Sequence, residues 1–233
     1  GWPVYSLAPR PGEEAETTAG FMAGLWPNSA IAILDDGTLN AHELAANIRL
    51  DLENKGIKPV MTDTFRPGLD NQKLLVRQLQ KVGATAVYVS GARTDVATIA
   101  HDAAGSGITF MGGEQLIAAD DDRPLPDGVL AVIPERWREQ PGASAIVQAL
   151  AERNVVAEGY VLPAHAAAQI VDKAESAMTG KQDFAAALAS GTFETAIGSV
   201  RFAKDHFRAD NVYRLLEWRN RSFQPPAKAG QTQ

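Results

Sequence analysis

The feature that most constrains the fold is a regular alternation of short apolar runs and longer amphipathic segments over residues 13–134. Each apolar run has the length of a buried strand, and each following segment repeats its apolar residues with the period of a helix. Leu44, Ile48 and Leu52, for example, share one face of a helix that ends near Gly56. This alternation predicts an α/β fold with a doubly wound parallel sheet. The predicted strands are "AIAILDD", "KPVMTDTF", "TAVYVSG", "ITFMGG" and "GVLAVIP".

The pattern changes after the last of these strands. Helical periodicity predominates over residues 143–153, 162–178 and 182–190, so this part is not a continuation of the same sheet. Two β-rich runs follow, "TAIGSVRF" and "NVYRLLEW", which we expect to pair as an antiparallel ribbon across the loop "AKDHFRAD". The last residues are rich in Pro, Gly, Gln and Ala, and they predict a loose tail.

Composition excludes several kinds of partner and site. The chain has 233 residues with 45% hydrophobic content, which is enough for an ordinary core. A formal charge of −6, without a cluster of Lys and Arg, argues against a nucleic-acid surface. Cysteine is absent, so disulfides and thiolate metal sites are excluded. No apolar run is long enough to span a bilayer, and the start at Gly1 is interpreted as a processing boundary.

Catalytic and cofactor motifs do not fit this chain. The only dinucleotide-like glycines, "GSG", precede a strand instead of following one, and neither a phosphate loop nor a Gly-x-Ser-x-Gly elbow is present. The four histidines lack metal-ligand spacing, so surface or packing roles are expected. An acid/base pair among Asp35, Asp36 and Glu114 stays open, but no nucleophile accompanies it. We therefore expect a protein without cofactor, metal or enzymatic activity.

Ligands of open parallel sheets gather beyond the carboxyl ends of the strands, where loops offer unpaired N–H groups. Asp35 and Asp36 lie at one such end, and they are expected to cap the turn into the next helix. Glu114 is harder to explain by capping, because the glycines before it let the backbone approach a ligand and a carboxylate can bind ammonium. The other strand-end candidates are Gly37, Thr38, residues 64–66, residues 90–93, Gly112, Gly113 and Gln115.

Several blocks, in order, resemble one family. These blocks are "IAILDDGTLNAHELA", "VYVSGARTDVATIAHDA", "FMGGEQL", "GYVLPAHAAAQIVDKA" and "TFETAIGSVRF" followed by "YRLLEW". The sequence is similar to the periplasmic substrate-binding proteins of branched-chain amino acid ABC transporters, the leucine-binding protein family of type I periplasmic binding proteins. The resemblance implies two Rossmann-like α/β lobes, joined by three crossovers, that close on a small molecule.

The resemblance also implies site residues. Glu114 falls on the carboxylate that binds the α-ammonium group of the ligand. Ala92 and Arg93, after Gly91, stand where an aromatic residue is common, and Asn40 and Ala41, after Thr38, stand where a Tyr-Gly pair is common. These departures argue against a plain leucine-like ligand. Arg93 would bind a second carboxylate or an aromatic acid, or it would instead face solvent or pair with Asp95.

Compared with full-length members of the family, the chain lacks the first strands and helices of the first lobe, so that lobe is expected to be incomplete. The apolar faces of its helices would then lack a partner, which predicts self-association or a companion fragment. The expected parts are the second lobe at 12–132, the helical part of the first lobe at 133–195, a crossover β-ribbon at 196–220 and a loose tail at 221–233.

The leading functional hypothesis is a periplasmic receptor that captures an amino acid or a related small carboxylate and delivers it to an ABC transporter permease. The alternative is a sensory or protein-interaction module that kept the fold without transport, which Ala92 and Asn40 favour. A hydrolase or transferase using the same cleft is the least favoured hypothesis, because no nucleophile is paired with a base.

Overall fold

The computed structural model describes residues 3–118, 123–178 and 183–226. The chain divides into two compact units. Unit 1 comprises Gly1–Pro11 with Glu135–Val212, and unit 2 comprises Gly12–Pro134 with Tyr213–Gln233. Among the helices of the described ranges, none is long and apolar enough to cross a membrane.

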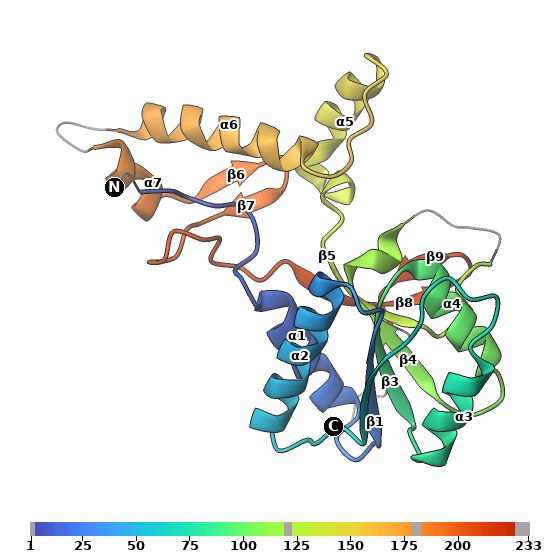
Figure 1. Cartoon of the computed structure of the whole chain (residues 1–233). Coiled ribbons are helices and arrows are strands. Elements are labelled where there is room, and N and C mark those ends of the chain that lie inside the picture. The colour runs from blue at the N-terminus through green and yellow to red at the C-terminus, as the bar shows by residue number, and fades with distance from the viewer. Residues whose placement is uncertain (1–2, 119–122, 179–182, 227–233) are drawn as a thin grey trace, which may run out of the picture. The chain divides into compact units, whose positions relative to one another are not determined.

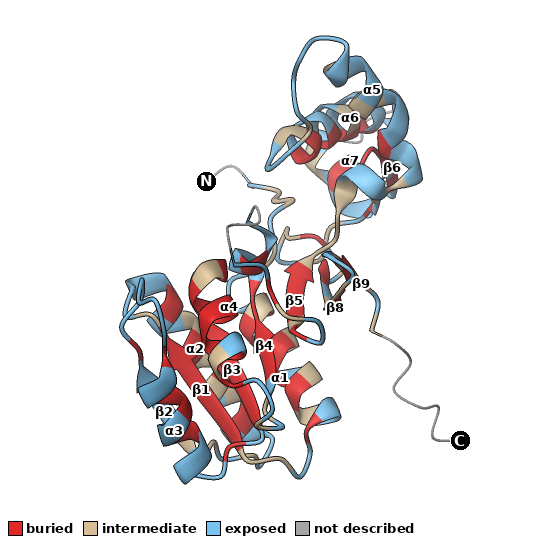
Figure 2. Cartoon of the chain, turned by 90° about the vertical axis from the view of Figure 1, so that its right-hand side faces the viewer, coloured by how far each residue is buried: buried red, intermediate tan, exposed pale blue. Residues whose placement is uncertain are grey.

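Unit 2 is built on a seven-stranded sheet in the order β2-β1-β3-β4-β5-β8-β9 (Figure 1). The first five strands of this order are parallel, which confirms the predicted doubly wound α/β fold. Every residue of β1 and β3 is buried, because helices cover both faces there (Figure 2). The strands are β1 (Ile31–Asp35), β2 (Met61–Thr64), β3 (Ala86–Ser90), β4 (Thr109–Gly112), β5 (Leu130–Pro134), β8 (Tyr213–Arg219) and β9 (Ser222–Gln224).

Two pairs of helices cover the two faces of this sheet (Figure 1). On one face lie α1 (Glu13–Leu25) and α2 (Leu39–Asn54), and on the other lie α3 (Lys73–Lys81) and α4 (Arg93–Asp102). The core beneath the second pair joins apolar residues of the strands to Leu79, Val96 and Ile99 of the helices. The loop after β4 contains a short 3-10 helix, η1 (Glu114–Ile117).

The predicted β-ribbon at 196–220 is wrong. Its first run forms a hairpin of its own, in which β6 (Phe193–Thr195) pairs with β7 (Gly198–Val200). The backbone can reverse within so few residues because Gly198 adopts a left-handed φ of 90°. The second run becomes β8, which pairs antiparallel with β5 and thereby buries Trp218 in the core of unit 2.

The predicted loose tail at 221–233 needs a correction as well. Asn220 and Arg221 both have positive φ, 50° and 61°, as in the tight two-residue turns that connect antiparallel strands. The chain therefore folds back as β9, and Phe223 packs edge-on against Trp218 with ring centroids 4.9 Å apart. Residues 227–233 of the predicted tail lie outside the described residues.

Unit 1 is a smaller assembly of helices with the β6–β7 hairpin. Its helices are α5 (Ser144–Ala151), α6 (Val161–Ala177) and α7 (Phe184–Ser190), preceded by the 3-10 turns η2 (Trp137–Glu139) and η3 (Pro141–Ala143). Leu162, Ile170 and Phe193 belong to its core. No residue of α5 is buried, although its sequence "SAIVQALA" is largely apolar (Figure 2).

Candidate functional site

The sheet order brings together three of the loops that the sequence singled out. Because β1, β3 and β4 are neighbours in the sheet, the loops at their carboxyl ends follow one another along one edge. The N–H of Asp36 donates to the Ser90 carbonyl at 3.0 Å and ties the first two loops together. The predicted ligand residues that are exposed along this edge are Thr38, Asn40, Ala92 and Glu114.

After β1, hydrogen bonds brace the turn that leads into α2. Asp35 is only 2% exposed, and its Oδ1 accepts from the Gly37 N–H and from the Thr64 hydroxyl, each at 3.0 Å. Asp36 Oδ1 accepts from the N–H and the hydroxyl of Thr38. The N-cap of α2 is Thr38, which accepts from the Ala41 N–H at 3.4 Å. The two aspartates thus hold the turn while the threonine caps the helix.

Gly91 and Ala92, which follow β3, lie in different environments. Gly91 is buried, and a Cβ atom there would lie 2.8 Å from the Phe65 ring, so this close approach requires glycine. Ala92 is exposed and occupies the N-cap position of α4 without a capping side chain. The exposed side chain at the carboxyl end of β3 is therefore the methyl group of Ala92.

Arg93 points inward, so the predicted alternative in which it faces solvent is wrong. The residue is 5% exposed, and its guanidinium carbon lies 4.3 Å from the centre of the Trp218 ring. Its Nη1 donates a hydrogen bond to the Leu116 carbonyl of η1. The guanidinium thus links α4 to the short helix that begins with Glu114.

Glu114 occupies a tight corner. Gly112 and Gly113 are buried, and Glu114 is the first exposed residue after β4. The backbone N–H of Glu114 donates to Oε1 of Glu14, the second residue of α1, at 3.4 Å. A Cβ atom at Gly113 would lie 2.7 Å from that oxygen and 2.9 Å from the Tyr88 hydroxyl, which explains the glycine. Three segments far apart in the sequence therefore meet around Gly113.

The charges at this corner affect one another. Burial raises the pKa of Glu14 to about 7, the Glu114 N–H partly offsets this rise, and the Glu114 charge adds to it. Burial also raises the pKa of Tyr88 well above its usual range, and the charge of Glu14 adds to that effect. The acid/base hypothesis named Asp35, Asp36 and Glu114, whereas the carboxyl whose pKa responds to the Glu114 charge is Glu14. Over the ranges that the structure describes, no three His, Asp or Glu side chains gather as a metal site.

The sequence patterns did not single out Glu14 or Tyr88. Glu14 stands in an acidic first turn of a helix, which is ordinary because the helix dipole favours carboxylates there. Tyr88 stands inside a buried strand, where an aromatic residue is expected to be core. The two glycines before Glu114 were the only local sign of these contacts, because glycine allows other atoms to come close to the backbone.

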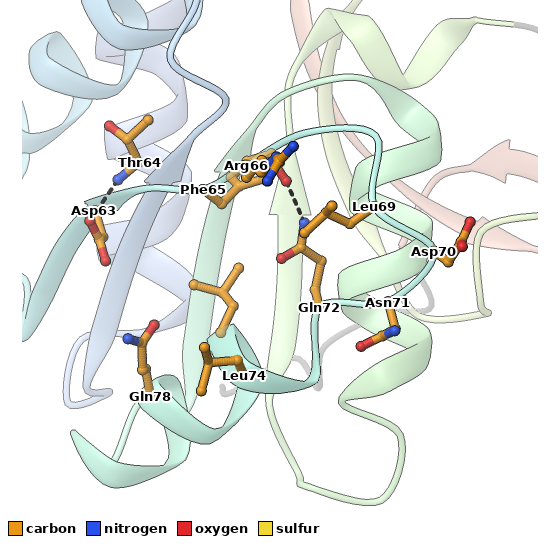
Figure 3. Close-up of a pocket in the computed structure, with 11 residues that line it drawn as sticks. Asp63, Thr64, Phe65, Arg66, Leu69, Asp70, Asn71, Gln72, Leu74 and Gln78 are labelled. Atoms are coloured by element: carbon orange, nitrogen blue, oxygen red, sulfur yellow. Dashed lines mark hydrogen bonds between the residues drawn. The ribbon is translucent and has the colours of Figure 1, made fainter.

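A hollow opens where β2 leads into α3. It has a volume of about 610 Å³ and is lined by residues of 63–78, among them Asp63, Arg66 and Leu74 (Figure 3). The Gln72 side chain closes the loop by donating to the Arg66 carbonyl at 2.7 Å. Leu74 is 70% exposed, so the hollow offers an apolar patch among polar groups. It contains one candidate strand end, residues 64–66, and it does not include Glu114.

Comparison with known sequences places the chain in a family. The profile of a family described as periplasmic binding protein matches residues 3–223. The leucine-, isoleucine-, valine-, threonine- and alanine-binding protein of Pseudomonas aeruginosa is 26% identical over 208 residues, which cover 85% of this chain. A Leu/Ile/Val-binding protein homologue of Brucella melitensis is 26% identical over 226 residues, or 92% of this chain. The chain spans only 55% and 61% of the length of these two relatives.

Solved structures share the fold at lower identity. A protein of Rhodospirillum rubrum assigned to branched-chain amino acid ABC transport aligns over 94% of this chain and 66% of its own, with a TM-score of 0.74 and 18% identity. A substrate-binding protein of Desulfitobacterium hafniense, in complex with Leu, aligns over 91% and 64%, with a TM-score of 0.64 and 17% identity. A solute-binding protein of R. palustris, in complex with benzoate, aligns over 91% and 61%, with a TM-score of 0.61 and 17% identity. The resemblance to branched-chain amino acid binding proteins is thus confirmed, and the chain belongs to the periplasmic binding protein family.

Proposed function

We propose that the protein is a solute-binding receptor of an ABC importer, which captures an amino acid through its α-ammonium group. The observation that carries this proposal is the position of Glu114, an exposed carboxylate at the carboxyl end of β4, directly after two buried glycines. Relatives named for binding Leu, Ile, Val, Thr and Ala support an amino acid as the ligand. A single exposed carboxylate of this kind is suited to binding an ammonium group and not to catalysis.

The residues around Glu114 bear on which side chain the ligand carries. Ala92 and Asn40 expose a methyl group and an amide along the same edge. Small and polar groups there leave more room, and less apolar contact, than aromatic rings would. The ligand proposed is therefore an amino acid whose side chain is bulkier or more polar than that of leucine. Arg93 serves this site by holding η1 through the Leu116 carbonyl, and it is not assigned a ligand contact.

The experiment that tests this function is a thermal-shift and calorimetric screen of the full chain. The panel contains amino acids with apolar, polar and aromatic side chains, with benzoate as an acid that lacks an ammonium group. Ligand that binds only the folded state raises stability by about 2.7 kcal/mol at a hundred times its Kd. We expect amino acids to bind wild type and to lose binding in Glu114→Gln, with Glu16→Gln, which removes an exposed carboxyl of α1, as the control that keeps Glu114. Equal binding by Glu114→Gln would contradict the proposed role.

Membership of the family leads to two further proposals, on where the protein acts and on how it passes on its ligand. A receptor of this kind acts in the periplasm or another extracytoplasmic space and presents its ligand to a permease. Crosslinking of the ligand-loaded protein to membranes that contain the permease, and not to membranes without it, tests this step.

Unit 1 supports a separate proposal about association. Helix α5 buries none of its residues, and Val155, Val156 and Tyr160 beyond it are 43%, 62% and 80% exposed. Apolar surface of this kind favours association, and the proposed occupant is a second copy of the chain. Light scattering at micromolar concentration should show an oligomer, which Val156→Lys weakens. A monodisperse wild-type monomer would contradict this proposal. An oligomer that binds no ligand in the screen would instead favour a protein-interaction module.

A further inference from the structure

The carboxyl of Glu14 lies against the backbone of Glu114, the residue that carries the exposed carboxylate. Oε1 of Glu14 is 3.4 Å from the backbone nitrogen of Glu114, from which it accepts a hydrogen bond. The same oxygen and the Tyr88 hydroxyl lie 2.7 Å and 2.9 Å from the position that a Cβ atom of Gly113 would take. The Glu14 carboxyl, the Tyr88 hydroxyl and the Glu114 backbone are therefore packed around one glycine, with no room for a methyl group.

The burial of these groups is graded from the core to the surface. Tyr88 is fully buried, Glu14 is partly buried and Glu114 is exposed. Within the part of the chain that the structure describes, the Tyr88 hydroxyl has no hydrogen bond of normal geometry, although the nearby Ser90 side chain acts on it and lowers its pKa. Hydrogen bonding at a buried hydroxyl matters for stability, and the Glu14 carboxyl is an acceptor that lies against the same glycine. Glu14 thus stands between a buried donor and an exposed acid.

We propose that Glu14 is a second carboxyl of the cation site, which holds the Glu114 amide and shares with Glu114 the positive charge of a bound ammonium group. This inference rests on the proposed function of Glu114. One carboxylate balances the charge of one ammonium group, and a second one nearby strengthens the attraction for ligands that carry this charge. The pair therefore selects amino acids over acids such as benzoate, which would add a further negative charge.

Binding of an ammonium group is expected to change the protonation of Glu14. The groups that face Glu14 are Glu114 of η1 and Tyr88 of β3, and Tyr213 of β8 acts on Tyr88 in turn. On its own helix, Glu13 and Glu16 are the acids of the same turn. With no cation bound, burial and the Glu114 charge hold the pKa of Glu14 at about 7, so the group is half protonated at neutral pH. A bound ammonium group favours the ionised form, and Glu14 then releases its proton to solvent.

The test is calorimetric titration of the full chain with phenylalanine, whose side chain is bulkier than that of leucine, at pH 6, 7 and 8 and in buffers of different ionisation enthalpy. If Glu14 is ionised in the complex, affinity rises about tenfold from pH 6 to pH 8, and binding at pH 6 releases nearly one proton per phenylalanine. Glu14→Gln keeps an oxygen acceptor for the Glu114 amide but cannot ionise, so both effects should disappear. Glu16→Gln removes an exposed carboxyl from the same turn and should retain both.

The outcomes separate this inference from the proposed function. Phenylalanine binding that needs Glu114, with the same affinity and proton release in wild type and Glu14→Gln, would overturn the role of Glu14 and leave the receptor function intact. If no amino acid binds, the proposed function fails, and carbon-13 NMR titration of the Glu14 carboxyl tests the pair without ligand. In that case Glu114→Gln must lower the titration midpoint of Glu14, and an unchanged midpoint would overturn the inference.

Discussion

Replacing Glu14 with Gln should stabilise the protein, and the gain should grow as the pH rises from 5 to 8. Glu14 has its pKa raised from 4.5 to about 7 by burial, so the folded state holds a proton that the unfolded chain releases. Between these two values the folded state binds more protons than the unfolded state. The free energy of unfolding therefore falls as the pH rises through this range, and the loss is complete above about pH 7.

The size of the effect follows from the two pKa values. One pKa unit corresponds to about 1.4 kcal/mol. With 4.5 in the unfolded chain and about 7 in the folded one, the contribution of Glu14 to the free energy of unfolding falls by about 2–3 kcal/mol between pH 5 and pH 8. The Gln variant lacks this loss and keeps an oxygen that can accept from the Glu114 N–H. The difference in stability between variant and wild type should therefore grow by a similar amount.

Urea unfolding at pH 5, 6, 7 and 8, followed by circular dichroism, measures this difference directly. Glu16→Gln is the matched control, since it removes an exposed carboxyl from the same turn and should follow the wild-type curve. A Glu14→Gln curve parallel to wild type at all four pH values would show that Glu14 titrates as an ordinary exposed acid. The description of Glu14 as a buried carboxyl behind Gly113 would then be wrong.

Other substitutions test the remaining contacts. Arg93→Met should lower the free energy of unfolding by about 2–4 kcal/mol in urea, because the buried Leu116 carbonyl loses a charged donor; a loss below 1 kcal/mol would contradict this. Gly113→Ala should cost about 1–3 kcal/mol by calorimetry, because its Cβ has no room, whereas Gly20→Ala, with nothing within 4 Å, should not destabilise. Glu114→Gln should change the thermal midpoint little, since the side chain is exposed, and a large loss would mean that it has a structural role.

Periodicity was enough to predict the core of unit 2. The runs that became β1 and β3 are mostly apolar and buried at every residue because helices cover both faces, and this pattern is typical of a parallel sheet. Strand pairing after residue 190 was not predictable in the same way. The runs around Thr195 and Trp218 have similar β character, and only the tertiary core decides that Trp218 joins β5 while Thr195 turns back on itself.

In the candidate site, too, some residues were predictable from the local sequence and others were not. Glu114 was predictable because two glycines and an acid at a strand end are adjacent in the sequence. Glu14 was not, since its contact with Glu114 spans 100 residues and nothing local marks it. Arg93 was placed at the correct strand end, but the direction of its side chain depends on Trp218, which arrives from a distant strand. Sequence patterns thus locate the edge of the sheet and leave the inward contacts undetermined.

These inward contacts determine how firmly Glu114 is held before any ligand arrives. Helix η1 has only four residues, and a 3-10 turn of this length has poor hydrogen-bond geometry of its own. It is fixed instead from two sides, by Arg93 at the Leu116 carbonyl and by Glu14 at the Glu114 amide. Each anchor comes from a different helix packed on a different face of the sheet. The backbone of Glu114 is therefore held by the folded core, and under the proposed function a ligand would not have to spend binding energy on ordering the loop.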